Sequence, residues 1–573
     1  MEALSQEKQY TTPWLDRYRR NFHAWQRLQT ESNNTFERRI GIVESAFDGD
    51  GRYFEGRADV TALLTLETRC TLAPAELRRR VLLAWTSLRL HHVLLLARTR
   101  QEDDYEDTFL VVKRPNSVDE ALQEAATTVT FVEDHYGKVD AADLYQHCLN
   151  TARVFDPDQC LSRLFVLPLE PVHKDRSRLR FVQVSAHMIT DGLTMYNWVS
   201  HFIKLLNSSG HDLESGIDND CSSDGIWSRL PPAQEDLYPL VQGSIARQRW
   251  FWAIMRVLRH VRKPLPTAFT NPLRRPERLA SAVSMPPKYP AILDYSPHRK
   301  PPLNTFIASV TLTRSASQRL QRLARAANTS IGAGCFALVG LAMMELEEAR
   351  HPPAPLAERQ PFVASFPLNP RPFFGFSRAE SCMLAFSDGI VMPWLSSDLE
   401  LEGRFKLLAR SAHRQLRAYQ KRRRGPDVVV DVHSPARLLA HNYLTAVERA
   451  DSKLPPERRK GINPQGDYPA NVNFGGATCG VSSVGSTREW VRVGEYPLDG
   501  AAADGKDFVA DFRGVTMGVR ARDNEFLVGS TSDSEGIVHF DVSFDGNAID
   551  ETDMKRWKAK MEMLLEAADM AKL

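Results

Sequence analysis

The sequence predicts an α/β protein built from two lobes, each with a mixed sheet flanked by helices. Two observations lead to this prediction. Segments with the two-residue repeat of a strand alternate with segments that have the 3.6-residue repeat of a helix, first over about 205 residues and again from Phe306 onward. Ten prolines between Pro264 and Pro302 lie between these regions and indicate an irregular connector. We therefore expect an N-terminal lobe at residues 1–209, a connector with one packed helix at 210–303 and a C-terminal lobe at 304–573.

The first lobe is expected to contain at least two helices and four strands. A helical repeat covers residues 74–90, and Pro74 suits its first position because the N–H that proline lacks has no partner there. Apolar or alternating runs predict strands at 93–97, 108–113, 160–169 and 179–186. A second helix is expected at 193–206, with Thr190 or Asp191 as its N-cap and Ser208 to Gly210 at its end.

The connector and the second lobe follow the same logic. Residues 210–235 are polar and acidic, so irregular chain is expected there, whereas the repeat around 245–261 predicts a helix packed on a lobe. In the second lobe we expect strands at 306–312, 361–366, 526–530 and 536–544. Helices are expected at 315–327, 331–346, 401–424 (ended by Gly425) and from Asp553.

Composition and charge exclude several classes of protein. With 43% apolar and 25% charged residues the chain is typical of globular proteins, and a net charge of +2 favours neither a nucleic acid nor a membrane as partner. Neither a signal peptide nor a run of about 18 apolar residues is found. The seven cysteines are scattered without Cys-x-x-Cys or zinc-ligand spacing, so we expect a reduced, cytoplasmic protein without a metal.

One motif suggests chemistry. The alternating run at 179–186 ends in His187-x-x-x-Asp191-Gly192, and none of the other fifteen histidines is followed by aspartate at this spacing. A neutral imidazole with a pKa near its usual value of about 6.5 can accept a proton from a hydroxyl group. The alternative is a buried histidine that only ends the strand, and the motif alone does not decide between the two.

Several segments in a fixed order resemble the chloramphenicol-acetyltransferase-like superfamily. This superfamily includes plant BAHD acyltransferases, condensation domains of peptide synthetases and fungal O-acetyltransferases. The segments are residues 155–164, the motif at 187–192, 366–372 with Asn369 and Arg371, 473–485 with Ser483, and the strand and turn at 536–546. The length and the proline-rich connector are most similar to fungal acetyltransferases of the trichothecene 15-O-acetyltransferase type. Two features depart from the superfamily's patterns: Ala186 replaces a frequent second histidine, and the segment Asp511–Gly514 lacks the tryptophan of the plant motif.

The resemblance implies a role for each residue of the site. His187 would be the general base. Asp191 would point away from the substrate and pair with Arg371, although a plain helix N-cap is an alternative for this aspartate. Gly192 would permit a tight turn and a close approach of the backbone, where the alternative is an ordinary Asp-Gly turn. Ser483, or its neighbour Ser482, would donate a hydrogen bond to the oxyanion, unless these serines only form a turn.

The implied function is that of an O-acyltransferase. Two lobes would enclose a central channel in which an acetyl or other short acyl group passes directly from acetyl-CoA, the co-substrate, to a hydroxyl of a secondary metabolite within a ternary complex. No bound cofactor is expected, and the protein should be a monomer. Two alternatives stay open. The first is a condensation-type enzyme that takes its acyl group from a carrier protein and forms an ester, an amide or a cyclised product. The second is a binding module without catalysis.

Overall fold

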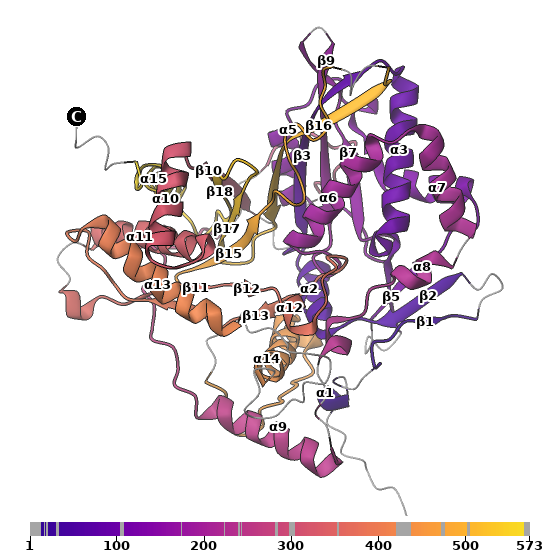
Figure 1. The fold of residues 1–573 in the computed structure, drawn as a ribbon. Coiled ribbons are helices and arrows are strands. Elements are labelled where there is room, and N and C mark those ends of the chain that lie inside the picture. Colours follow the sequence, from indigo (N-terminus) through magenta and orange to yellow (C-terminus); the bar gives the residue numbers. More distant parts are fainter. Residues whose placement is uncertain are drawn as a thin grey trace, which may run out of the picture.

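A computed structural model gives the arrangement of the chain (Figure 1). It describes residues 13–566 apart from 17, 19–20, 30–33, 103–107, 174, 223, 239–240, 242, 281–284, 297–303, 352–354, 420–436, 472–475 and 501–504. Within these residues, two six-stranded assemblies form the centres of two lobes, and helices pack on both. The α/β class and the two-lobed architecture expected from the sequence are confirmed.

The first lobe is centred on β3 (Val60–Cys70), which pairs antiparallel with β9 (Arg176–Ser185) over almost its whole length. β7 (Ser162–Val166) and β6 (Val129–Phe131) extend this sheet beyond β9, and β8 (Glu170–His173) pairs with β9 as well. Two helices, α3 (Pro74–His91) and α6 (Gly192–Leu206), pack against each other beside the sheet. Their buried tryptophans, Trp85 and Trp198, belong to the core of this lobe.

A small four-stranded sheet and several helices complete the first lobe. The small sheet has the order β1 (Gln26–Arg27), β2 (Thr35–Arg39), β5 (Thr108–Lys113) and β4 (Arg98–Gln101). The remaining helices of the lobe and of the chain that follows are α1 (Pro13–Asp16), α2 (Ile42–Tyr53), α4 (Val118–Ala126), α5 (Ala141–Asn150), α7 (Gly210–Ser222), α8 (Gly225–Arg229) and α9 (Ile245–His260).

The second lobe contains a sheet of mixed strand direction. Its order is β10 (Thr305–Thr311), β18 (Val538–Asp545), β17 (Phe526–Ser532), β15 (Cys479–Ser486), β11 (Phe362–Ser365) and β14 (Ile390–Met392). β15 is parallel to both β17 and β11, and the other pairs are antiparallel. The helices α10 (Arg314–Ala326), α11 (Ile331–Arg350), α13 (Leu401–Tyr419) and α15 (Glu551–Met563) pack on this sheet and on one another.

Two segments of the second half of the chain pack on the first lobe. β16 (Phe508–Val519) leaves the second lobe and pairs antiparallel with β3, so that it forms one edge of the first sheet. α14 (Arg437–Lys453) packs against α2 of the first lobe and against α9. Short elements lie near α14 and the motif helix α6, namely β12 (Pro367–Leu368), α12 (Arg371–Phe374) and β13 (Ala385–Phe386). The two lobes are therefore joined by paired backbone and by packed helices, as well as by the connector.

Most of the predicted elements are confirmed, some within a residue or two. Pro74 is the first residue of α3, β5 covers the predicted 108–113, and Asp191 rather than Thr190 caps α6. The helix predicted at 245–261 is α9. The helix predicted at 401–424 is α13, which ends at Tyr419 in the described part of the chain, while its expected end at Gly425 lies outside the described residues.

Two predictions were wrong. Residues 93–97 do not form a strand, because a 3-10 helix (Val93–Leu96) follows α3 directly and buries its apolar side chains against the core. A short apolar run reports burial and does not by itself distinguish extended from helical backbone. Residues 210–235 are not irregular, since they contain α7 and α8. Leu213, Ile217 and Cys221 of α7 are four residues apart and form a narrow buried stripe, which the polar composition of the segment concealed.

Within the described ranges, no single helix is both long enough and apolar enough to cross a membrane. The helices α10 and α11 meet both criteria only as a pair, and the chain bends by 110° between them.

Candidate functional site

His187 lies in the turn between β9 and α6, where the strand of the first lobe ends. The backbone N–H of Ala186 still donates to the carbonyl of Leu161, at 2.8 Å, and that of Ile189 donates back to Ala186 at 3.1 Å. These bonds hold the backbone one residue before and two residues after His187. The side chain of His187 therefore lies just beyond the carboxyl end of β9, and the following helix, α6, begins five residues later at Gly192.

Asp191 holds the start of α6 and a segment of the second lobe at the same time. Its Oδ1 accepts hydrogen bonds from the backbone N–H and the hydroxyl of Thr194, at 3.0 and 3.1 Å. Its Oδ2 accepts from Arg371 Nη2 at 2.8 Å and from the backbone N–H of Met383 at 3.1 Å. Both side chains of the ion pair are buried. The pairing implied by the resemblance and the plain N-cap are thus both present in one residue.

The segment around Met383 brings Cys382 against the histidine. Arg371 Nη2 also donates to the carbonyl of Ser381 at 2.6 Å, so the arginine links α6 to this segment through two bonds. As a result, the Sγ of Cys382 lies 3.8 Å from Nδ1 of His187. With Nδ1 facing Cys382, Nε2 is the ring nitrogen left to face a substrate.

Phe47 of α2 fixes the plane of the imidazole ring. The two rings are stacked, with their centroids 3.9 Å apart and their planes inclined by 5°. The motif did not predict this contact, because Phe47 lies 140 residues earlier in the chain, in a helix that was not expected from the sequence.

A partly buried cluster of charges lies beside Phe47, on the same side of α2. Asp50 of α2 accepts hydrogen bonds from Lys453 Nζ at 2.6 Å and from Arg522 Nε at 2.9 Å. Both cations also lie near the ring of Phe47, with Lys453 Nζ at 5.3 Å and Arg522 Cζ at 5.6 Å from its centroid. Burial lowers the pKa of Lys453 to about 8, and the positive charge of Arg522 acts in the same direction.

His187 is neutral at physiological pH. Its pKa is lowered to about 4, mainly because burial removes water from the ring, and the positive charge of Arg522 adds to this effect. A hydrogen bond with the residue's own backbone and the charge of Asp191 act in the opposite direction, while Lys453 lowers the pKa further. A neutral imidazole is the form that a general base requires.

His187 and Phe47 line a cavity of about 1190 Å³. Its walls come from both lobes: Phe366 and Phe386 contribute aromatic surface, and Lys453 and Arg522 contribute positive charge. Pockets for small molecules are usually lined by apolar side chains with a few convergent polar groups, and this cavity is large enough for a substrate of that kind. Three histidine, cysteine or acidic side chains placed to hold a metal ion are not found together in the part of the chain that the structure describes.

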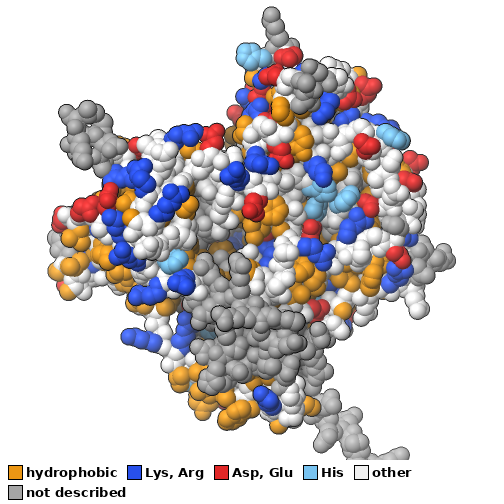
Figure 2. All heavy atoms as spheres, viewed as in Figure 1, with side chains coloured by type: hydrophobic (Ala, Val, Ile, Leu, Met, Phe, Trp, Pro, Cys, Tyr) orange, Lys and Arg blue, Asp and Glu red, His pale blue; other side chains and the backbone are white. Residues whose placement is uncertain are grey.

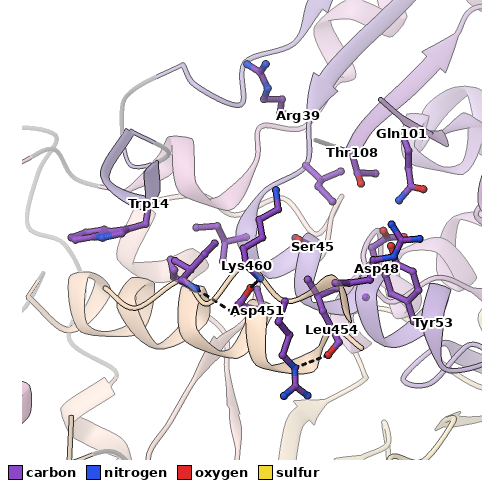
Figure 3. Close-up of a pocket in the computed structure, with 18 of the residues that line it drawn as sticks. Trp14, Arg39, Ser45, Asp48, Tyr53, Gln101, Thr108, Asp451, Leu454 and Lys460 are labelled. Atoms are coloured by element: carbon purple, nitrogen blue, oxygen red, sulfur yellow. Dashed lines mark hydrogen bonds between the residues drawn. The ribbon is translucent and has the colours of Figure 1, made fainter. Parts of the chain in front are cut away.

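A second cavity, of about 610 Å³, lies on the opposite side of the contact between α2 and α14 (Figure 3). Figure 3 shows Ser45 and Asp48 of α2 and Asp451 of α14 around this space, with Trp14 at one side. Asp451, Arg459 and Ile462 line both cavities, so the last turn of α14 and the segment after it form a wall between them.

Ser483 does not lie on the wall of the cavity that contains His187, although the resemblance implied a position beside the substrate. It is an exposed residue of β15, next to a bulge between Ser483 and Gly485, and its hydroxyl would lie 3.3 Å from a Cβ on Gly332. The residues that line the cavity with His187 include Cys479 and Gly480 of the same strand but not Ser483.

Gly192 does not have the conformation that its expected role requires. It is the first residue of α6, outside the left-handed region, and a Cβ there would meet Val484 at an ordinary contact distance of 3.5 Å. The expectation that a tight turn or a close backbone approach demands glycine at this position was therefore wrong.

The comparisons with known proteins support the fold. No family model matches this sequence, and no curated protein is similar to it in sequence. Among solved structures, the trichothecene 15-O-acetyltransferase of Fusarium sporotrichioides superposes with a TM-score of 0.63 and 12% identity, over 95% of this chain and 97% of that one. The condensation domain of the monacolin K polyketide synthase superposes with a TM-score of 0.51 and 11% identity, over 93% of this chain and 98% of that one. The fold implied by the sequence resemblance is thus confirmed.

Proposed function

From the fold that this chain shares with an O-acetyltransferase and a condensation domain, we propose that it is an acyltransferase with His187 as its general base. The acyl group, acetyl or another short chain, comes from acyl-CoA and is transferred to a hydroxyl of a small secondary metabolite. The observation that carries this proposal is a neutral histidine at a strand end, with its ring held by Phe47 and Cys382, on the wall of a large cavity. The enzyme works as a cytoplasmic monomer.

The proposed reaction is a direct transfer. Nε2 of His187 removes the proton from the acceptor hydroxyl while the hydroxyl oxygen attacks the carbonyl carbon of the thioester. The tetrahedral intermediate then collapses, the carbon–sulfur bond breaks, and the departing thiolate takes the proton back from the imidazolium. The low pKa of His187 makes this return of the proton favourable, because the imidazolium is a stronger acid than the thiol that forms.

Three further residues support the reaction in this proposal. Asp191 and Arg371 are positioning residues, since their ion pair joins α6 to the segment that presses Cys382 against His187. Ser483 is proposed as the donor to the oxyanion. Its strand contributes to the cavity wall through Gly480, three residues earlier, so a substrate that extends along β15 would come near its hydroxyl.

The test of the proposal is the reaction itself. The purified protein and its His187→Ala variant are incubated with acetyl-CoA and a panel of hydroxylated metabolites, and released thiol and product mass are measured together. We expect a gain of one acetyl group with the unaltered protein and a rate at least about 10²-fold lower with the variant. His351→Ala, at an exposed histidine that is not among the residues lining the cavity, is the matched control and should leave the rate unchanged. A folded His187→Ala variant with full activity would refute the assignment.

A condensation-type reaction is the second candidate. The match over 98% of a polyketide-synthase condensation domain favours it, since the same histidine would act on an acyl group bound to a carrier protein. The same panel is therefore repeated with acyl-phosphopantetheine carrier protein as donor. A product formed from this donor, and none from acetyl-CoA, would replace the first candidate by the second.

A further inference from the structure

The helix α9 is apolar on two faces, and one of them is exposed. The inner face carries Phe251, Trp252 and Met255, which are buried against α14 and α1. Trp252 lies 5.5 Å from the ring of Trp14 and 5.9 Å from that of Tyr443, measured between centroids. The buried arginine of this face, Arg259, is held by Glu448 at 2.7 Å. The inner face therefore accounts for the packing of α9 on the protein.

The outer face is a stripe of large apolar side chains. Trp250, Val257 and Val261 are 67%, 57% and 66% exposed, and their spacing of seven and four residues places them on one side of the helix. Ile245 begins the same helix and is 69% exposed. Tyr468, also exposed, packs its ring edge-on against His260 at the carboxyl end. An exposed apolar surface of this extent marks a place where another surface binds.

The charges within α9 and the three residues after it are of one sign. Residues 245–263 contain five arginines and one lysine and no aspartate or glutamate. Two of the arginines have partners in the protein, Arg259 with Glu448 and Arg262 with Asp388. Arg247 and Arg249, near the start of the helix, are exposed, and so is Lys263 after its end. The stripe is thus flanked at both ends by cations, which a negatively charged surface would complement.

The position of α9 suits a flat surface. In Figure 1 the helix lies along the lower edge of the molecule, and Figure 2 shows hydrophobic side chains together with Lys and Arg side chains at this edge. A helix that lies in a membrane interface has an apolar face, a basic flank and aromatic side chains at the level of the headgroups, as α9 has with Trp250.

We propose that the outer face of α9, with Tyr468, docks the protein on an anionic phospholipid surface. The apolar stripe enters the headgroup region, and Arg247, Arg249 and Lys263 contact lipid phosphates and carboxylates. This differs from the expectation that no membrane is a partner, which was drawn from a net charge of +2. The net charge is a sum over the whole chain, and it conceals a segment with six cations and no acid.

The test is binding of the full chain to vesicles, measured by co-sedimentation. Vesicles of phosphatidylcholine with about 30% phosphatidylserine are compared with vesicles of phosphatidylcholine alone. We expect binding to the first that weakens when the salt concentration rises, and at least about tenfold weaker binding to the second. The double variants Trp250→Asp/Val257→Asp and Arg247→Glu/Arg249→Glu should each lose binding by a similar factor.

Matched control variants show whether loss of vesicle binding is specific to α9 or follows from altering any exposed apolar or basic residue. Leu407→Asp on α13 alters a residue that is 55% exposed, and Arg322→Glu/Arg325→Glu alters two exposed arginines of α10; both should bind vesicles as the unaltered protein does. Melting temperatures show whether each variant is folded. Absence of binding to anionic vesicles, or equal binding by the α9 variants, would overturn the proposal. A dimer in solution that Trp250→Asp/Val257→Asp dissociates would also overturn it, because the face would then be covered by a second copy.

Discussion

At the scale of single residues, the site depends on how neighbours set the charge and the orientation of His187. Asp191 does not touch the ring, yet its ion pair with Arg371 positions the segment that carries Cys382. Lys453 and Arg522 do not touch the ring either, but both lower its pKa through space. Asp191 therefore acts on the position of the imidazole ring, and Lys453 and Arg522 act on its pKa.

The pH dependence of the reaction should reveal the effect of Lys453. Because His187 must be neutral, the rate should hold down to about pH 5 and fall as the pH passes through about 4. Removing a neighbouring cation stabilises the imidazolium, so Lys453→Met should move this fall to a higher pH by a few tenths of a unit. The profiles of kcat/KM against pH give the measurement. Lys406→Met on α13 is the control, and a Lys453→Met profile that moves to lower pH would contradict the electrostatic argument.

Asp191→Asn should harm the enzyme through its fold. The asparagine can still cap α6, but Arg371 then lies buried without a negative partner, and breaking a buried ion pair costs about 3–5 kcal/mol of the free energy of unfolding. Arg314→Met is the control, because its pair with Glu535 is exposed on both sides and such pairs contribute about 0–1 kcal/mol. Unfolding by urea measures both. An Asp191→Asn protein with unchanged stability and no activity would show instead a direct role in the reaction.

At the scale of elements, the site arises from the ends of helices and strands that approach one another. His187 follows the end of β9, Asp191 caps the start of α6, α2 contributes Phe47, and α14 ends at Lys453. Each element forms for local reasons that the sequence shows, such as alternation in β9 and an N-cap in α6. The local reasons do not explain why the four elements meet at His187, because that depends on how the elements pack.

Substitution of Gly192 and of Gly518 by alanine should change the stability of the protein by different amounts. Gly192→Ala at the start of α6 should retain activity and change the free energy of unfolding by less than about 1 kcal/mol, since the helical position accepts a Cβ. Gly518→Ala in β16 should destabilise the protein by about 1–3 kcal/mol, because the new Cβ would lie 2.5 Å from the side chain of Ile307 and 2.7 Å from the hydroxyl of Tyr145. Thermal and urea unfolding compare the two. Loss of activity in a stable Gly192→Ala variant would restore the role first expected of this glycine.

At the scale of the whole molecule, the two lobes are joined by several contacts besides the connector. β16 completes the first sheet although it belongs to the second half of the chain, and α14 packs on α2. The backbone carbonyl of Thr305 in β10 accepts a hydrogen bond from Asn150 of α5 at 2.8 Å, which adds a contact between the lobes. The boundaries that we propose at residues 209 and 304 therefore divide the sequence into segments, and these segments are not independent folding units.

Unfolding should accordingly occur in one step. Hydrogen exchange read by mass spectrometry, along a urea titration, reports β3 of the first lobe and β17 of the second separately. We expect both strands to lose protection at the same urea concentration, because separation of the lobes would expose the ladder between β3 and β16. Two separate transitions would show that the lobes are independent.

The sequence by itself determined the class of the fold, fewer than half of the described helices and strands, and the position of His187 at a strand end with Asp191 four residues later. These features depend on spacing within one element, and burial of one face imposes that spacing directly on the chain. The likeness of short segments to a known superfamily added the pairing of Asp191 with Arg371.

Only the tertiary structure decided the rest of the site. Phe47 comes from α2, about four hundred residues before Lys453 at the end of α14 and Arg522 in the segment before β17. No pattern within those segments marks these three residues. The same holds for β16, whose partner strand lies more than four hundred residues earlier, and for the exposed second face of α9. The physical reason is that periodicity tells which face of an element is buried but not what buries it, so the charge and packing around His187 follow from contacts that the order of residues does not contain.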